Sequence, residues 1–274
     1  MEQIPDRTAI FQTCGSSEHQ NNWIDTQDAL KKRLVTKDDF TWRLPSSIPE
    51  RDGEGGGGER KEVLKYVGGV DISFSKEDPS IACGTLVVLD LQSFNVVYAD
   101  FSVARLHIPY IPGFLAFREA PILWELLKKM KKEAPLVYPQ LLMVDGNGLL
   151  HPRGFGLACH LGVLADIPTI GIGKNLHHVE GLTQLKVREL LEDGANKEFV
   201  DLIGDSGCTL GVAMRATLGA LKPIFVSIGH RISLSTAVKV VKLTCKYRVP
   251  EPIRQADMRS RDYLRRRAFI QSNS

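Results

Sequence analysis

The chain of 274 residues carries a formal net charge of +3, and 43% of its residues are hydrophobic, so it can build at least one sizeable folded core. It contains no run of about 18 uncharged apolar residues, so we expect no membrane span. Its N-terminus lacks the basic-then-apolar pattern of a secretory signal. The five cysteines form no CxxC pair and are odd in number, which favours reduced thiols over a disulfide framework or a zinc ribbon.

The first sixty residues contain two segments of low apolar content. Residues 1–22 are polar and aperiodic, and we expect them to be disordered. Residues 23–35 show apolar side chains near helical spacing and predict a short packing helix. Residues 50–62 are rich in glycine and charge, which is typical of a flexible insertion. We therefore predict one domain over residues 23–268, with a tail at 269–274.

Three β-branched segments follow the glycine-rich insertion. Residues 66–74, 81–91 and 96–106 each have strand composition. The connections between them are too short for a crossover helix, so the three strands are expected to form an antiparallel meander.

A helix and a series of alternating elements complete the chain. The helix carries one apolar stripe from Ile122 to Met130, and Pro121 must lie in its first turn or at a kink. Residues 139–145 and 167–173 are continuous apolar runs, as buried parallel strands should be. A hairpin, a helix and a final helix from about Pro252 come last. This order predicts an α/β fold in which a mixed sheet, an antiparallel meander plus parallel strands, is flanked by helices.

Three acidic residues occupy unusual positions in this pattern. Asp71 interrupts the first strand, Glu119 lies on the apolar side of the helix, and Asp145 ends a buried strand at its carboxyl end, where sites in open α/β sheets gather. Each one alone is consistent with a structural role, such as capping a turn. If they converge, their mutual repulsion requires a cation, and all-oxygen ligands favour Mg²⁺ or Mn²⁺. The pattern then indicates metal-assisted phosphoryl chemistry.

With these acids, the meander, helix and strand resemble the ribonuclease H-like arrangement. Five segments, in chain order, resemble the endonuclease V family: VGGVDISF, PYIPGFLAFRE, MVDGNGLLHPRGFGLACHLGV, TIGIGKNL and SIGHRISL. The C-terminal PEPIRQAD is similar to the animal members. The resemblance covers roughly residues 23–268 outside the glycine-rich insertion.

The resemblance implies an activity and a substrate. It implies a Mg²⁺-dependent endonuclease, with Mn²⁺ as a substitute, that cuts nucleic acid at the second phosphodiester 3′ to inosine and leaves 3′-hydroxyl and 5′-phosphate ends. Animal members are similar in preferring inosine-containing single-stranded RNA, with DNA as a secondary substrate. The mechanism expected is one in-line attack by water on the phosphate, without a covalent enzyme intermediate.

The resemblance also implies catalytic residues. Asp71, Glu119 and Asp145 are the implied metal ligands, and Ser73, two residues after Asp71, is expected to orient that ligand. The remaining catalytic candidates are Lys174, His230 and Asp257. Lys174 matches a lysine near the scissile phosphate. His230 either serves the attacking water and the metal's outer shell or is a satisfied polar group, and Asp257 is either a fourth acid or an ion-pair partner of nearby arginines.

A stiff turn precedes Glu119. Pro109 and Pro112 fix φ on both sides of Tyr110 and Ile111, so the tyrosine ring is held out at little entropic cost. The resemblance favours a wedge that enters the base stack where a base has been turned out. The alternative is a tyrosine packed over a loop core.

The family's base pocket matches Gly113, Leu115, Gly146, Leu157 and Gly171. Glycine lets backbone amides approach the edges of hypoxanthine, and a tight wall rejects the 2-amino group of guanine. Each glycine alone is also explained by a turn or a close helix–strand contact.

Three side chains of the specific HPRGFGLACH block have further expected roles. His151 and Arg153 are expected to contact phosphate next to the metal, whereas His160, on an apolar helix, is expected to be structural. Residues 254–267 carry six arginines against two aspartates, which is either a solvated helix face or a phosphate-binding surface.

The sequence is consistent with four hypotheses about function. The first is an inosine-specific endoribonuclease, and the second is a deoxyinosine-specific DNA repair endonuclease. The third is a non-catalytic protein that binds inosine-containing nucleic acid, and the fourth is a scaffold protein. We expect a monomer without membrane contact in the cytoplasm and nucleus, with the nucleolus also open.

Overall fold

The computed structural model describes most of the chain. It describes residues 17–45, 62–108, 111–193, 198–217, 220 and 222–272. Most of the predicted disordered N-terminus and of the glycine-rich insertion therefore lies outside the described residues. So do Pro109 and Tyr110, the centre of the predicted wedge.

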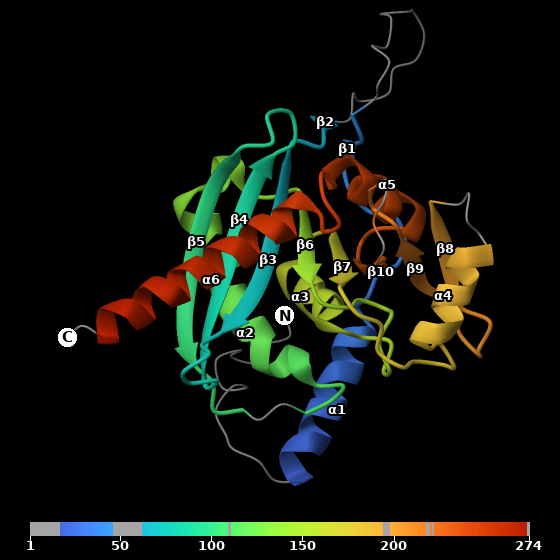
Figure 1. The fold of residues 1–274 in the computed structure, drawn as a ribbon, viewed down its shortest axis with the longest axis horizontal. Helices are drawn as coiled ribbons and strands as arrows, with labels where there is room; N and C mark the ends of the chain where they lie inside the picture. Colours follow the sequence, from blue (N-terminus) through green and yellow to red (C-terminus); the bar gives the residue numbers. More distant parts are fainter. Residues whose placement is uncertain are drawn as a thin grey trace, which may run out of the picture.

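An eight-stranded mixed sheet forms the centre of the molecule (Figure 1), with strand order β5-β4-β3-β6-β7-β10-β9-β8. The strands are β3 (Tyr66–Phe74), β4 (Ile81–Asp90), β5 (Val96–Arg105), β6 (Leu141–Asp145), β7 (Thr169–Gly173), β8 (Phe199–Ile203), β9 (Thr209–Met214) and β10 (Ile224–His230). The β3–β4–β5 meander is antiparallel, and β3, β6 and β7 run parallel. The predicted mixed-sheet α/β fold is confirmed.

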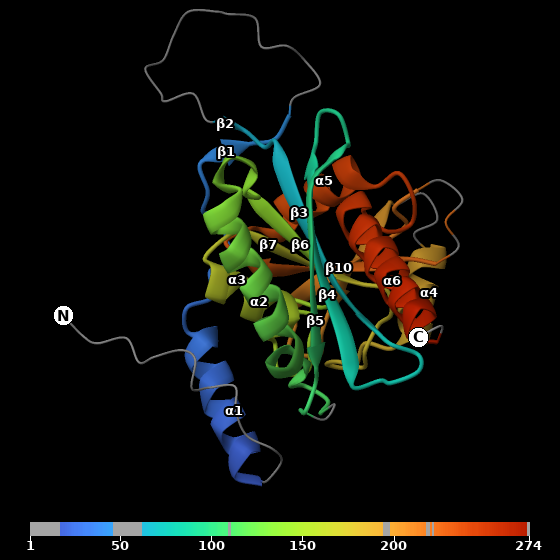
Figure 2. The same ribbon diagram turned by 90° about the vertical axis from the view of Figure 1, so that its left-hand side faces the viewer.

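Helices cover both faces of this sheet. They are α1 (Ser17–Lys31), α2 (Leu115–Glu133), α3 (Leu157–Ala165), α4 (Gln184–Asp193), α5 (Leu234–Thr244) and α6 (Glu251–Ser272), with a short 3₁₀ turn, η2, at Pro135–Val137. Figure 2 shows α2 and α3 on one face and α5 and α6 on the other. A separate parallel pair joins β1 (Trp42–Arg43) to β2 (Glu62–Val63).

Three helices have boundaries that differ from the sequence expectation. Helix α1 begins at Ser17, inside the segment expected to be disordered, and ends at Lys31 rather than at residue 35. Helix α2 begins at Leu115, well before the apolar stripe, so Pro121 lies inside the helix and not in its first turn. The earlier start places Glu119 within the buried stripe that Ala116, Ala120 and Leu123 also form. Helix α6 continues to Ser272, into the segment expected to be a tail.

Gly69 in β3 allows helix α6 to approach the sheet. A Cβ atom at Gly69 would lie 2.2 Å from the carbonyl oxygen of Pro252, in the first turn of α6. Only a residue without a side chain permits this contact. The helix therefore crosses directly over β3 and β4, as Figure 1 shows, and carries its later residues onto Asp71.

Two findings concern the helices and the cysteines of the described part of the chain. None of its helices is both long enough and apolar enough to cross a membrane. The four cysteines within it, Cys83, Cys159, Cys208 and Cys245, are free thiols. The fifth, Cys14, lies outside the described residues.

Candidate active site

Asp71 and Asp145 lie side by side because of the register of two parallel strands. Val70 on β3 pairs with Val144 on β6, so the next residue of each strand is an aspartate at the same level. Residues at the same level of neighbouring strands point to the same face. That face is the one that α6 covers, so the two carboxylates meet beneath α6.

Asp71 is a buried carboxylate, 4% exposed, with two hydroxyl donors. Ser73 Oγ and Ser260 Oγ each donate to its Oδ2 at 3.1 Å, and the two hydroxyls lie 2.6 Å apart. Burial raises the pKa of Asp71, and the adjacent carboxylate of Asp145 raises it further by hydrogen bond and by charge. The ionised form of Asp71 is therefore poorly compensated by the chain alone.

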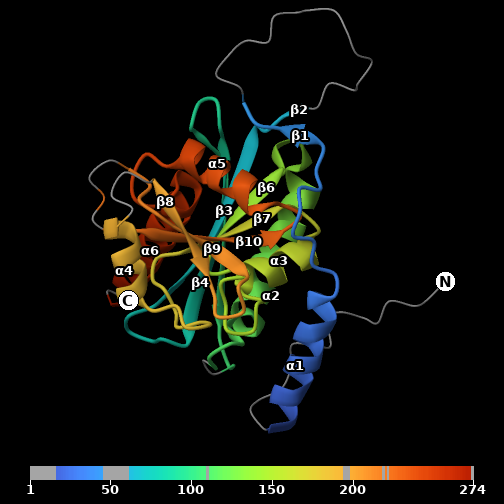
Figure 3. The same cartoon turned by 90° about the vertical axis from the view of Figure 1, so that its right-hand side faces the viewer.

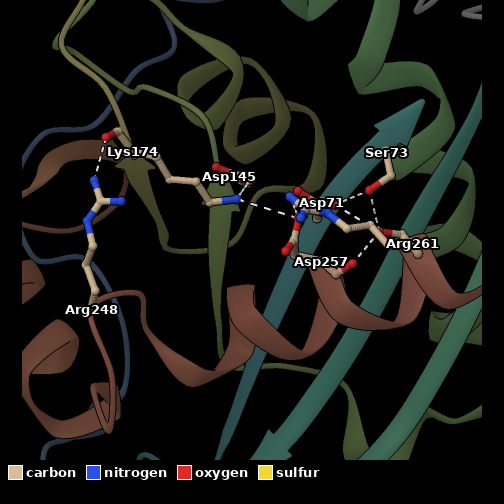
Figure 4. A network of polar contacts seen from close by, with 8 residues as sticks. Asp71, Ser73, Asp145, Lys174, Arg248, Asp257 and Arg261 are labelled. Atoms are coloured by element: carbon tan, nitrogen blue, oxygen red, sulfur yellow. Dashed lines mark hydrogen bonds and ion pairs between the residues drawn. The ribbon is translucent and has the colours of Figure 1, made fainter. Parts of the chain in front are cut away.

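Lys174 supplies the cation nearest to these acids (Figure 4). Its Nζ lies 2.6 Å from Asp145 Oδ2 and 3.8 Å from Asp257 Oδ1. Burial lowers the pKa of Lys174, but Asp145, Asp71 and Asp257 together raise it above its usual value. Asp257 also pairs with Arg261 at 2.7 Å, one turn further along α6. Asp257 thus lies beside the acids and is at the same time an ion-pair partner of an arginine.

Glu119 reaches the acidic cluster from α2, the helix that packs on the other face of the sheet. It is 7% exposed, and burial raises its pKa to about 8, with the charge of Asp145 adding to the rise and Arg118 opposing it. Helix α2, which bears Glu119, does not cover Asp71 and Asp145. Instead α6 covers them, and Glu119 is coupled to Asp145 through its charge.

The donor set fits a hard divalent cation, although the side chains do not form a finished cage. Within the described ranges, no three His, Cys, Asp or Glu side chains are already placed to hold a metal ion. However, Asp71, Glu119 and Asp145 offer only oxygen donors, and two of them carry raised pKa values because buried negative charge there lacks a counter-ion. Oxygen donors of this kind suit Mg²⁺ or Mn²⁺.

A cavity of about 470 Å³ opens beside this cluster. This volume lies within the range of small-ligand sites. Six of the predicted substrate-binding residues line it: Pro112, Gly113, Leu115, Gly146, His151 and Leu157. Asp145 and Lys174 line it as well, so the cavity shares a wall with the acidic cluster. Gly113, with φ of +84°, forms a turn in its wall that a residue with a side chain would adopt only under strain.

Gly171, predicted for the base pocket, and Ile111, predicted for the stiff turn, do not line this cavity. A Cβ atom at Gly171 would lie 2.4 Å from the backbone nitrogen of Gly148. Gly171 therefore allows β7 to pack against the loop after β6, which is the close-contact role left open by the sequence. Ile111 accepts the backbone hydrogen bond of Phe114 ahead of α2 and does not line the cavity.

Arg153 is held by the N-terminal helix. Its guanidinium donates from Nε to Gln27 Oε1 and pairs through Nη2 with Asp28 at 3.2 Å. These contacts point the side chain toward α1, so the predicted phosphate contact for Arg153 does not match its position. His151, by contrast, lines the cavity, and burial, followed by the nearby His177, lowers its pKa to about 4.

His230 lies far from the acids, contrary to its predicted place at the edge of the active site. On β10 it pairs with Thr169, the first residue of β7, whereas Lys174 follows the last residue of β7. His230 is 3% exposed, and its Nδ1 accepts a hydrogen bond from Val35 N. Of the two alternatives for His230, the structure therefore favours a buried polar group whose hydrogen bonds are made within the protein. His160 is also buried, edge-on to Phe117 at a centroid distance of 5.0 Å, as expected for a structural residue.

Several residues of the site carry no sequence signal that singles them out. Ser260 reaches Asp71 from α6, and Arg248 holds the backbone of Lys174. The cavity wall also contains Asn147, His177 and His178. Asn147 lies in the VDGNG block, and the two histidines follow Lys174 closely, so proximity to a predicted motif was the signal available for these three. Ser260 and Arg248 become visible only when α6 and the segment before it are placed in space.

A mixed sheet with buried carboxylates and a lysine at one edge, beside a cavity large enough for a nucleoside, is the arrangement of a nuclease. A family model described as Endonuclease V matches residues 57–258. The chain belongs to the endonuclease V family, and it is an endonuclease.

Relatives and solved structures agree with this assignment. The chain is 46% identical to endonuclease V of Mus musculus over 246 residues, which is 89% of this chain and 69% of the relative. It is 43% identical to endonuclease V of Homo sapiens, over 89% of this chain and 83% of the relative. The crystal structure of human endonuclease V is similar with a TM-score of 0.78 and 41% identity, covering 90% of this chain and 99% of that one.

A complex is also similar to this chain. The crystal structure of Ciona intestinalis endonuclease V with a 24mer DNA containing an inosine followed by a ribo-adenosine matches with a TM-score of 0.79 and 33% identity. The match covers 92% of this chain and 99% of that one.

Proposed function

We propose that this endonuclease is Mg²⁺-dependent and cuts single-stranded RNA that contains inosine, with inosine-containing DNA as a weaker substrate. In this proposal the cut falls at the second phosphodiester 3′ to inosine and leaves 3′-hydroxyl and 5′-phosphate ends. The observation that carries the proposal is the wall that the cavity shares with Asp145 and Lys174. The Ciona intestinalis relative was crystallised with inosine-containing DNA, which supports inosine as the base recognised here.

The cavity is the proposed site for the hypoxanthine base. Gly113 and Gly146 present backbone without side chains, and Leu115 and Leu157 supply apolar contact for the ring. Asn147 Oδ1 is a buried acceptor with no hydrogen-bond partner among the described side chains and backbone. Hypoxanthine carries a donor at N1, where adenine carries an acceptor. In this proposal the Asn147 side chain turns its oxygen toward the base and so favours inosine over adenosine.

Asp71, Glu119 and Asp145 are the residues that would hold Mg²⁺. The buried and undercompensated carboxylates of Asp71 and Glu119 support this assignment. A bound Mg²⁺ supplies Lewis-acid stabilisation of the phosphate and lowers the pKa of water. Ser73 and Ser260, which both donate to Oδ2 of Asp71, fix the orientation of that carboxylate.

Lys174 is the proposed cationic partner of the scissile phosphate. In the structure its ammonium group forms ion pairs with Asp145 and Asp257. This group has three hydrogen-bond donors, so it can also bind a non-bridging phosphate oxygen of the substrate. In that position it offsets the charge that develops during in-line attack by water. Its pKa, raised by the surrounding acids, keeps it protonated for this role.

Cleavage of matched oligomers tests the proposal. Single-stranded RNA and DNA oligomers with one inosine, and the same oligomers with adenosine or guanosine in its place, are incubated with Mg²⁺ or with EDTA. We expect cutting of the inosine RNA in Mg²⁺, slower cutting of the inosine DNA, and none in EDTA. Faster cutting of the DNA would favour a DNA repair enzyme. Tight binding of inosine RNA without cutting would favour a non-catalytic binding protein.

A further inference from the structure

A second and larger cavity, of about 780 Å³, adjoins the candidate active site. Helix α4 forms one side of it, and the β9–β10 end of the sheet with Arg248 forms the other. Figure 3 shows α4 beside β8, β9 and β10. Lys174 and Asn175 line both this cavity and the proposed base pocket, so a strand that passes Lys174 can reach both.

The lining of the second cavity combines cations with an apolar wall. Its basic residues are Lys174, Arg188, Arg215, Lys222 and Arg248, and its acidic residue is Glu192. The apolar wall includes Val187, Leu191 and Phe225. Basic side chains next to apolar and aromatic surface are the combination that binds single-stranded nucleic acid, because phosphates meet the cations and bases lie on the apolar wall.

Not all of these cations are equally placed for a ligand. Arg248 donates from Nη2 to the carbonyl oxygens of Lys174 and Pro223, so these donors already bind the protein's own backbone. Arg188 pairs with Glu192 at 2.8 Å, but both side chains are largely exposed, and an exposed pair of this kind is weak. Arg188 can therefore turn to a phosphate, and Lys222 is exposed on the opposite side of the cavity.

We propose that the second cavity binds the substrate strand on the 3′ side of the scissile phosphate, through phosphate contacts from Arg188 and Lys222. This inference rests on the proposed function, which places inosine in the first cavity and the cut 3′ to it. The strand then runs from the base pocket, past Lys174, into the second cavity. Because phosphates and not base edges make the charged contacts, this part of the site reads no sequence.

Kinetics on substrates with different tails test this path. The substrates are single-stranded RNAs with one inosine and a fixed 5′ segment, carrying either two or eight nucleotides 3′ of the cut. The variants are Arg188→Ala and Lys222→Ala. Lys186→Ala is the matched control, because Lys186 is exposed on the same helix α4 and does not line the cavity.

We expect each variant to raise KM about tenfold on the long 3′ tail, as loss of one charge-assisted contact should, with kcat within about twofold of the unsubstituted protein. On the short tail the variants and the protein itself should have equal KM. The proposal is overturned if Lys186→Ala raises KM as much as Lys222→Ala. It is also overturned if the loss persists on the short tail.

A binding measurement separates failure of this inference from failure of the proposed function. Affinity for the long RNA is measured by fluorescence anisotropy in EDTA across a series of salt concentrations. For a single strand, log Kd should depend on log salt with a slope smaller by roughly 0.7 for each variant that has lost a phosphate contact. This slope changes even if the enzyme proves not to require inosine. An unchanged slope in both variants rejects the second cavity while leaving the inosine proposal intact.

Discussion

Arg248 holds the backbone of Lys174. Its Nη2 donates to the carbonyl oxygen of Lys174 at 2.7 Å (Figure 4). The same Nη2 donates to that of Pro223 at 2.9 Å, and Nε donates to that of Lys222 at 3.2 Å. The guanidinium thereby joins the end of β7 to the start of β10. Lys174 extends from this fixed point to Asp145, so Arg248 is a positioning residue for the lysine.

Replacing Arg248 should impair turnover through Lys174. In Arg248→Lys a single ammonium cannot reproduce the planar set of donors, so we expect kcat to fall about tenfold with little change in thermal stability. In Arg248→Ala we expect kcat to fall further and to recover partly when millimolar guanidinium is added. Arg254→Lys, which alters a guanidinium that pairs with Glu251 elsewhere on α6, should leave kcat unchanged. Equal kcat in Arg248→Lys and the unsubstituted protein would rule out the positioning role.

Removing either aspartate of the central pair should separate cleavage from binding. We expect Asp71→Asn and Asp145→Asn to lower kcat at least about 100-fold, because each carboxylate is proposed to hold the Mg²⁺ that stabilises charge on the phosphate. The Kd for inosine RNA should change by no more than a few-fold. The melting temperature should rise with added Mg²⁺ in the unsubstituted protein and not in Asp71→Asn. Retention of the Mg²⁺-induced shift in both variants would remove these residues from the metal site.

Gln27 joins helix α1 to two walls of the proposed base pocket. This side chain is 1% exposed, and its Nε2 donates to the carbonyl oxygens of Phe155 at 2.9 Å and of Gly113 at 3.3 Å. Its Oε1 accepts from Arg153. Trp23, one turn earlier, stacks on Phe117 at a centroid distance of 5.3 Å. Helix α1 therefore fixes the turn at Gly113 relative to the loop that ends at Phe155.

The variant Gln27→Ala should loosen this pocket. One buried and one part-buried carbonyl group and a guanidinium would each lose a partner, and the expected loss of unfolding free energy is about 1–3 kcal/mol. KM for inosine RNA should rise more than kcat falls, because the pocket and not the acidic cluster is disturbed. Asp28→Asn, which alters only an exposed pair with Arg153, serves as the control and should have a small effect. A fall in kcat without a change in KM would contradict this assignment.

His160 should make the protein less stable in mild acid. Burial lowers its pKa from about 6.5 to about 4, so the folded state keeps it neutral while the unfolded state binds a proton. The unfolded state then gains protons as the pH falls from 6.5 toward 4, and stability is lost across that window. At pH 4.5 the loss from this group amounts to about 2–3 kcal/mol.

The measurement is the free energy of unfolding by urea at pH 7 and at pH 4.5. Comparing the unsubstituted protein with His160→Gln isolates this histidine, because the acidic residues that also titrate there are common to both. The difference between the two pH values should be smaller in His160→Gln by about 2–3 kcal/mol. An equal difference in the two proteins would show that His160 does not resist protonation.

Much of the fold follows from local patterns along the chain. The short connections after β3 and β4 permit only antiparallel pairing, so the meander was predictable. Continuous apolar runs marked β6 and β7 as strands buried on both faces. Helix α4 and strand β8 were not predicted, because α4 buries little besides Val187 and Leu191, and β8 is a short edge strand with alternating exposure.

The residues of the candidate site were predictable where the short segment that contains them also carries a recognisable sequence pattern. Asp71, Glu119 and Asp145 stood out because carboxylates interrupt apolar patterns, and Gly113, Gly146 and Leu157 came from compact motifs that line one cavity. His230 shows the limit of this reasoning. Its motif follows the others in the chain, but β10 runs antiparallel to β7, so His230 lies at the opposite end of the sheet from Lys174.

Local sequence patterns were enough to predict most of the strands and helices and to single out the misplaced acidic residues, because periodicity, turn residues and burial of apolar side chains are local properties. The tertiary structure decided which side chains meet. Ser260 on Asp71, Arg248 on Lys174 and Gln27 on Gly113 join residues separated by 189, 74 and 86 positions. Such contacts depend on strand direction, on register and on the face that each helix covers, and no local pattern encodes these.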